Sequence, residues 1–179
     1  MSEPRQLADI PRSIRAIGQL AGTTAASEVE AARIEDAIEA LATDYASRPA
    51  VRVFYQIWHD PLQTINGEHL ISKVIALCGG RNVFAAERPL APRVSLESVL
   101  QADPEVILAS GMGEARPDWL DAWRDFPDLR AVTLDGLLYV DPNLLQRPTA
   151  RVLRGAGSVC RQVDDVRGRL PASGPPAPR

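Results

Sequence analysis

Three adjacent side chains that could bind a ligand or take part in catalysis, Trp58, His59 and Asp60, follow an apolar segment at residues 51–57. Apolar residues alternate along that segment, which predicts a buried β-strand. Pro61 ends the strand, because proline lacks the N–H group that a sheet ladder needs. The strand would therefore end by presenting an indole, an imidazole and a carboxylate side by side.

These side-chain types suit a ligand site at the end of a strand. An indole can pack flat against a large apolar ligand, and a neutral imidazole can coordinate a metal ion. The alternatives are that Trp58 fills the core between elements, and that His59 is a turn residue bonded to Asp60 or to the backbone. We predict that Trp58, His59 and Asp60 line a cleft.

No other residues form a catalytic or metal-binding motif. The sequence has no GxSxG, P-loop or GxGxxG motif, so we predict no enzymatic activity; the alternative is a small α/β enzyme that uses His59 and Asp60 together as a base. His59 and His69 are the only histidines, and Cys78 and Cys160 the only cysteines, so we expect no metal site. The cysteines can form a disulfide only if the fold brings them within reach.

The overall composition limits the classes of partner. The 179 residues are 45% hydrophobic and 24% charged, which fits one globular domain with room for a partial second element. A net charge of −3 argues against a nucleic-acid partner, which would require a basic face. Because no apolar run reaches about 18 residues, and the first residues lack the pattern of an export signal, we expect neither a membrane span nor a signal peptide in this chain.

Periodic patterns predict helices and strands along the whole chain. Trp119 and Trp123 lie four residues apart on one predicted helix, and we expect them to pack rather than to bind. Two short strands are expected around a turn at Asp135 and Gly136, and a loop over residues 81–92. The other expected elements are strands at 51–57 and 104–110, and helices at 7–20, 24–45, 66–80, 95–103, 118–129 and 148–166.

Strands and helices alternate from residue 51 onward, which favours an α/β sandwich with a mostly parallel sheet. Ligands of such sheets bind beyond the carboxyl ends of the strands. The loops at Trp58, at Gly111–Gly113 and at Asp141 would all lie at that edge. The sequence therefore predicts a binding site where these loops meet.

Three stretches carry a resemblance to a known family: "VFYQIWHDPLQTINGEHLISKVIALCGGRNVF", "APRVSLESVLQADPEVILASG" and "LLYVDPNLLQRPTARVL". Their order and spacing resemble the carboxyl-terminal lobe of cobalamin-binding substrate-binding proteins of ABC importers, within the wider siderophore, haem and cobalamin group. The resemblance covers about residues 5–168. It implies a three-layer α/β sandwich lobe with a mostly parallel sheet, preceded by a long connecting helix.

The resemblance also implies a domain organisation. Residues 1–22 would be the remnant of a first-lobe helix and 23–48 the long connecting helix. Residues 49–168 would form the carboxyl-terminal ligand-binding lobe, and 169–179 a disordered proline-rich tail. Family members hold ligand between two lobes, so the resemblance implies that the amino-terminal lobe is absent from this chain.

Several residues receive roles from the resemblance. Glu97 matches a carboxylate that docks onto arginines of the permease; otherwise it is a first-turn glutamate favoured by the helix dipole. Arg147 matches an arginine that faces the ligand; otherwise it forms a surface salt bridge. Asn143, also expected to bind ligand, stands where the family has an acidic residue, and Ala91 where it has a tryptophan. Trp58 and His59 would compensate for these departures.

The resemblance implies a solute-binding component of an ABC importer, with cobalamin or another corrinoid as the transported ligand and no cofactor. Its partners would be the corrinoid and the importer permease, in the periplasm, although the chain shows no signal peptide. A haem-binding or ferric-siderophore-binding protein of the same superfamily is the alternative, as is a self-associating fragment that forms a homodimer through the surface left by the missing lobe. A lone lobe should bind corrinoid weakly, because it offers only part of the enclosing surface.

Overall fold

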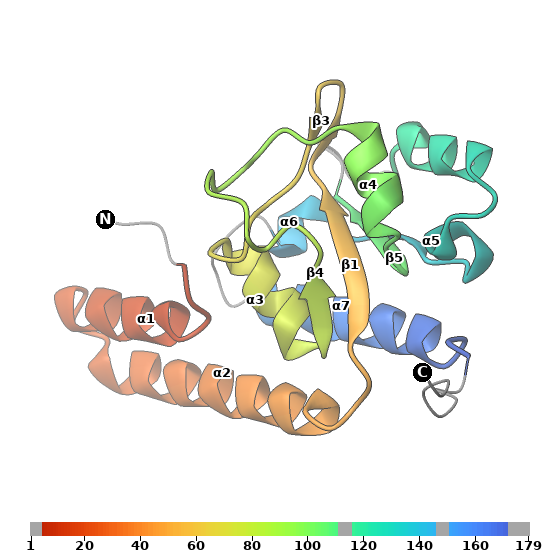
Figure 1. Cartoon of the computed structure of the whole chain (residues 1–179). Coiled ribbons are helices and arrows are strands. Elements are labelled where there is room, and N and C mark those ends of the chain that lie inside the picture. Colours follow the sequence, from red (N-terminus) through yellow and green to blue (C-terminus); the bar gives the residue numbers. More distant parts are fainter. Residues whose placement is uncertain (1–4, 111–115, 146–150, 172–179) are drawn as a thin grey trace.

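A parallel sheet of four strands runs through the centre of the protein (Figure 1). The structure is a computed structural model that describes residues 5–110, 116–145 and 151–171. All neighbouring strands pair in parallel. In spatial order the strands are β4 (Gly80–Asn82), β1 (Val51–Gln56), β5 (Val106–Ala109) and β6 (Leu137–Tyr139). The direction of winding reverses between β1 and β5, which is the switch point where doubly wound sheets bind ligands.

Helices cover both faces of the sheet, so the fold is the predicted three-layer α/β sandwich. On one face lie α2 (Thr24–Tyr45), α3 (Leu70–Leu77) and α7 (Arg151–Arg167); on the other lie α4 (Leu96–Ala102), the 3₁₀ helix η1 (Asp118–Asp125) and α5 (Arg130–Thr133). Helix α1 (Asp9–Leu20) packs along α2, and the short α6 (Pro142–Leu145) precedes α7. None of the described helices is both long and apolar enough to cross a bilayer.

Two clusters of buried apolar residues form the core, one on each face of the sheet, and β1 contributes side chains to both. Val51, Val53 and Tyr55 are buried against α3 and α7, while Phe54 lies in the second cluster, beside Trp123 at a centroid distance of 5.9 Å. Because both faces are buried, the strand reads as a nearly continuous apolar run, as parallel strands do. The sequence prediction for this strand is confirmed.

The helix predicted over residues 24–45 is present as α2, which lies beside α3 and α7 (Figure 1). Arg15 of α1 donates hydrogen bonds to Glu28 and Glu35 of α2 and so holds the two helices together. Ile17, Leu20 and Val29 are large apolar side chains of this helix pair that stay exposed. The role of α2 as a connector and the expected homodimer remain predictions.

A disulfide joins Cys78, at the end of α3, to Cys160 in α7. Both cysteines are fully buried, and 82 positions separate them in the sequence. The pairing, which the sequence left open, therefore cross-links two helices that cover the same face of the sheet.

The predicted pair of strands around Asp135 and Gly136 is wrong. Residues Arg130–Thr133 form α5, and only Leu137–Tyr139 is a strand, paired in parallel with β5. Gly136 makes this path possible, because a Cβ at this position would lie 2.3 Å from the Glu105 carbonyl oxygen. The chain turns tightly after α5 and enters the sheet edge in the same direction as β5.

The expectation of a loop from residue 81 onward is also wrong at its start, because Gly80–Asn82 form β4 beside β1. The strand carries polar residues and has no apolar alternation. Asn82 is buried, and its side-chain amide donates to the Ile65 carbonyl at 2.8 Å and to the Ser72 hydroxyl at 2.9 Å. Hydrogen bonding of a polar side chain, which hydrophobic patterns do not detect, fixes this strand.

Candidate ligand-binding site

A short β-hairpin extends beyond the carboxyl end of β1 (Figure 1). Its strands are β2 (Trp58–His59) and β3 (Leu62–Gln63), which pair antiparallel around a cis Asp60–Pro61 peptide bond. The sequence predicted that Pro61 ends the strand, but it did not predict this second, two-stranded sheet. The hairpin places Trp58 and His59 at the switch-point edge of the main sheet.

Three rings form what we call the aromatic rim, namely Trp58, His59 and Trp119. The His59 ring lies 5.0 Å from that of Trp58, at an interplanar angle of 47°, and is stacked on Trp119 at 5.8 Å and 14°. Trp58 is half-buried, and its indole Nε1 donates to the Asp60 carbonyl at 2.8 Å; the His59 and Asp60 side chains are exposed. Trp58 therefore does not fill a core, which leaves it available at the edge.

The buried side-chain amide of Gln56 connects the aromatic rim to the core. Gln56, the last residue of β1, is only 1% exposed. Its Oε1 accepts a 2.8 Å hydrogen bond from Trp123 Nε1, and its Nε2 lies 3.5 Å from the Trp58 carbonyl oxygen. Since Trp119 and Trp123 lie four residues apart in η1, anchoring Trp123 also places Trp119 against His59.

The packing expected of the two tryptophans is observed, because Trp123 is buried in the cluster that contains Phe54 and the half-buried Trp119 packs against the same cluster. Trp119 in addition contacts His59. Their spacing predicted a shared face of an α-helix, but η1 is a 3₁₀ helix, in which side chains three positions apart, and not four, are aligned. The spacing also did not indicate that η1 meets the end of β1. The contacts of Gln56 with Trp123 and Trp58 were also missed, because a glutamine at the end of a strand gives no signal of its partner.

The neighbouring strands end at the same edge. After β5, the Ser110 side chain is hydrogen-bonded to the Tyr55 hydroxyl. After β6, Asp141 accepts a 2.8 Å hydrogen bond at Oδ1 from the backbone N–H of Asn143, which is half-buried in α6. The Gly111–Gly113 turn and Arg147, both expected at this site, lie outside the described residues.

Glu97 is exposed in the first turn of α4. Its own backbone N–H and the Ser95 hydroxyl hydrogen-bond its carboxylate and thereby hold the Glu97 pKa below its ordinary value. Ser95 is the predicted N-cap of this helix, since its Oγ accepts from Ser98 N at 3.1 Å. Glu97 is therefore an ordered, solvent-facing anion at neutral pH.

The hairpin is joined to the segment that leads into α4. Val94 N donates to the Leu62 carbonyl at 3.0 Å, and Gln63 forms a bridge with Arg93. These contacts place the amino end of α4 beside the hairpin. Glu97 and the aromatic rim consequently lie at the same edge of the sheet.

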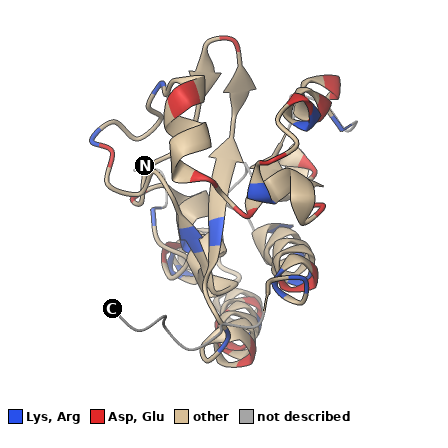
Figure 2. Ribbon diagram, turned by 45° about the vertical axis from the view of Figure 1, so that its right-hand side comes forward, with Lys and Arg blue, Asp and Glu red and all other residues tan. Residues whose placement is uncertain are grey.

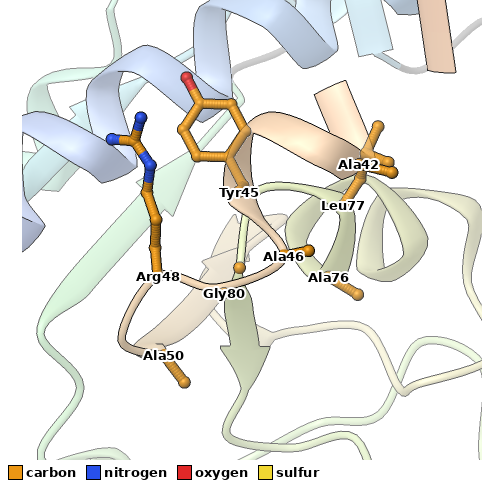
Figure 3. Close-up of a pocket in the computed structure, with 9 residues that line it drawn as sticks. Ala42, Tyr45, Ala46, Arg48, Ala50, Ala76, Leu77 and Gly80 are labelled. Carbon is orange, nitrogen blue, oxygen red and sulfur yellow. The ribbon is translucent and has the colours of Figure 1, made fainter. Parts of the chain in front are cut away.

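A pocket of about 420 Å³ lies at the opposite edge. Its lining includes Ala50, which precedes β1, and Gly80, which begins β4, so it adjoins the amino ends of the strands (Figure 3). Arg48 places its guanidinium over the Tyr45 ring at 4.9 Å and pairs with Asp164. This pocket is therefore distinct from the edge that carries the aromatic rim.

Charged residues of both signs lie along the described part of the chain. Figure 2 shows acidic and basic residues interspersed along the helices of the ribbon. Among the residues that the structure describes, no group of three or more histidine, cysteine, aspartate or glutamate side chains could hold a metal ion. The described part of the candidate site consists chiefly of aromatic side chains, with the exposed imidazole of His59 among them.

Comparison with known proteins agrees with this architecture. The family described as periplasmic binding protein matches residues 1–133, and the chain belongs to that family. The homologues of this chain are substrate-binding transport proteins. The vitamin B12-binding protein of Vibrio cholerae is 33% identical over 159 residues, and that of Vibrio campbellii 29% identical over 161 residues.

Solved structures show the same fold. The periplasmic vitamin B12 binding protein of Vibrio cholerae matches with a TM-score of 0.82 at 30% identity, over 93% of this chain and 64% of that one. A periplasmic heme-binding protein from Roseiflexus matches with a TM-score of 0.80 at 22% identity, over 92% of this chain and 65% of that one, and shares the fold. The two curated relatives above are matched over 89% and 90% of this chain, which spans 57% and 58% of their lengths.

Proposed function

We propose that this chain captures cobalamin or a related corrinoid for an ABC importer, by non-covalent binding at the carboxyl edge of its sheet. The observation that carries this proposal is the 33% identity to a vitamin B12-binding protein across 89% of the chain. The corrinoid is the transported ligand, and the proposal includes no cofactor and no catalytic step. The site of action is the periplasm, in keeping with the family.

The geometry of the edge supports a large, flat ligand. The His59 ring contacts both Trp58 and Trp119, and the three rings offer aromatic groups next to the switch point. Aromatic side chains contribute large apolar contact areas, and their rigidity keeps the entropic cost of binding low. Asp60, and on the α6 side Asn143, would supply hydrogen-bonding groups for the corrin amides, and Arg147 is proposed for the same role.

Delivery to the permease is assigned to Glu97. Its carboxylate is exposed and ordered by Ser95, and a carboxylate of this kind can accept a bidentate, charge-assisted contact from an arginine. Because Val94 is hydrogen-bonded to Leu62 of the hairpin, the docking carboxylate and the ligand-facing residues share one edge. A permease that binds Glu97 would therefore lie next to the ligand that it accepts.

Equilibrium dialysis at high protein concentration tests the proposal, with cyanocobalamin and ferric haem as the two probes. Contact with one sheet edge covers only part of a corrinoid, so we expect a dissociation constant of about millimolar order. Trp58→Leu should weaken retention of cyanocobalamin, whereas Leu20→Ala, at an 87% exposed position on α1, should not.

If the protein retains haem but not cyanocobalamin, the ligand is a porphyrin and not a corrinoid. If the wild type and Trp58→Leu retain cyanocobalamin equally well, the hairpin does not contact the ligand. Either result would contradict the function proposed above.

A further inference from the structure

The exposed His59 imidazole is held by aromatic contacts alone. Its ring contacts Trp58 and Trp119, and within the described part of the chain neither ring nitrogen has a hydrogen bond or an ion pair. Its position is nevertheless defined, because β2 pairs with β3 and the stack on Trp119 fixes the plane of the ring. The side chain is thus oriented without using its nitrogen atoms.

The other histidine has a structural role. His69 caps α3, where its Nδ1 accepts a 3.2 Å hydrogen bond from the backbone N–H of Ile71. It is half-buried at the start of the helix. The chain therefore has one histidine engaged in a helix cap and another whose nitrogens are available at the ligand edge.

We propose that His59 is an axial ligand that coordinates the central metal of the captured macrocycle. This inference rests on the proposed function and extends it from surface contact to metal coordination. The coordinating lone pair of imidazole lies in the plane of the ring. Face-to-face stacking on Trp119, at an interplanar angle of 14°, therefore holds the ring without covering that lone pair.

A single histidine suits a metal that is already bound in a macrocycle better than it suits a bare metal ion. No cluster of three or more potential metal-ligating side chains exists among the described residues, so His59 has no protein partners there with which to hold a bare ion. A single imidazole suffices when a macrocycle already fills the equatorial positions of the metal, as in haem proteins with one axial histidine. Cobalt in a corrin ring and iron in a porphyrin share this property.

Coordination is a simple ligand exchange. The neutral imidazole nitrogen donates its lone pair to the metal, and the water molecule that occupied the axial position leaves. The oxidation state of the metal does not change, and no additional reactant is required. Trp119 acts as a positioning residue in this step, since it orients the ring that donates.

Visible absorption and electron paramagnetic resonance spectroscopy test the proposal. The probe is aquacobinamide, a cobalt corrinoid that carries no nucleotide base of its own and so leaves its axial positions to water. With the wild-type chain we expect a shift of the visible bands and, after reduction to cobalt(II), a nitrogen triplet splitting. His59→Ala should abolish both signals. His69→Asn, which retains a good helix cap, should preserve them.

Trp119→Leu should reduce the fraction of nitrogen-coordinated cobalt more than it reduces the total corrinoid retained in dialysis. If the wild type retains aquacobinamide but shows no nitrogen splitting, His59 does not coordinate the metal. The proposed function would be unaffected by this result. Failure to retain any corrinoid would overturn the proposed function itself. A parallel titration with ferric haem distinguishes a corrinoid from a porphyrin. If a nitrogen signal that depends on His59 appears with haem and not with aquacobinamide, the metal that His59 coordinates is that of a porphyrin.

Discussion

Trp123 donates a 2.8 Å hydrogen bond from its indole Nε1 to Oε1 of Gln56, and this bond joins η1 to the end of the central strand. Both residues are buried, with exposed fractions of 4% and 1%. Four positions before Trp123, Trp119 stacks on His59. One buried hydrogen bond therefore links the packing of a surface helix to the position of the aromatic rim.

Replacing Gln56 by leucine should destabilise the fold by about 1–3 kcal/mol, because the buried indole N–H of Trp123 would lose its acceptor. Urea denaturation followed by circular dichroism measures this change. The rim should also loosen, since the Gln56 amide contacts the Trp58 carbonyl.

Trp123→Phe provides the matched control, because it removes the donor. The double variant should be less unstable than the sum of the two single changes, which is the mark of a direct interaction. Strictly additive free energies of unfolding would show that the hydrogen bond contributes nothing of its own.

The disulfide should contribute strongly to stability. Cys78 and Cys160 are separated by 82 positions, and closing so long a loop restricts the unfolded chain. Paired replacement by alanine should lower the free energy of unfolding by roughly 2–5 kcal/mol. Denaturation of the wild type with and without a reducing agent gives a second measurement of the same quantity. The reductant should have no effect on the alanine pair, and equal stability of the two proteins would contradict the expectation.

The contact between α1 and α2 should depend on pH. Hydrogen bonds from Arg15 lower the pKa of both Glu28 and Glu35 below the ordinary value of 4.5. The stabilisation is therefore present above that value and is lost as the pH falls through the lowered pKa of the folded state. Acid titration followed by thermal unfolding should show this loss in the wild type.

Arg15→Gln should flatten the same acid dependence, because Glu28 and Glu35 would then titrate closer to their ordinary values. Arg33→Gln is the control. Arg33 lowers the pKa of Glu30 within α2 alone. Arg33→Gln should therefore change only the part of the acid profile that comes from Glu30 and leave the contact between the two helices intact. An unchanged acid profile in Arg15→Gln would exclude the proposed role of this cluster.

Glu97→Lys should abolish docking to the permease of a corrinoid importer while changing the free energy of unfolding by no more than about 0.5 kcal/mol, as expected for an exposed residue. Stimulation of the ATPase activity of the reconstituted importer is the measurement. Glu87→Lys reverses another exposed carboxylate, on the loop before α4, and should have little effect. Equal stimulation by the wild type and by Glu97→Lys would remove Glu97 from the docking surface.

Local patterns predicted those parts of the fold that local physics determines. The alternation in β1, the Ser95 cap and the helical stripe of α2 all follow from neighbouring residues, and the structure contains each of them. The short strand β4 escaped prediction because it has no apolar alternation; it is held by its parallel pairing with β1 and by the hydrogen bonds of the buried Asn82.

The candidate site was predictable only in part. Trp58 and His59 stand out because they follow a strand, and the structure places both at its carboxyl edge. The stack of His59 on Trp119 joins residues 60 positions apart in the sequence, and the Gln56–Trp123 bond joins residues 67 apart. Such long-range pairs depend on how η1 folds back over the sheet, which no local spacing encodes.

The most direct test of corrinoid capture at the aromatic rim is a titration of the protein with cyanocobalamin, followed by nuclear magnetic resonance of the tryptophan indole N–H signals. The three tryptophans are distinguishable by their environments. The signals of Trp58 and Trp119 should move saturably, while that of Trp123, hydrogen-bonded to Gln56 in the core, should stay in place. If the signals of Trp58 and Trp119 do not move, corrinoid capture at the aromatic rim is contradicted.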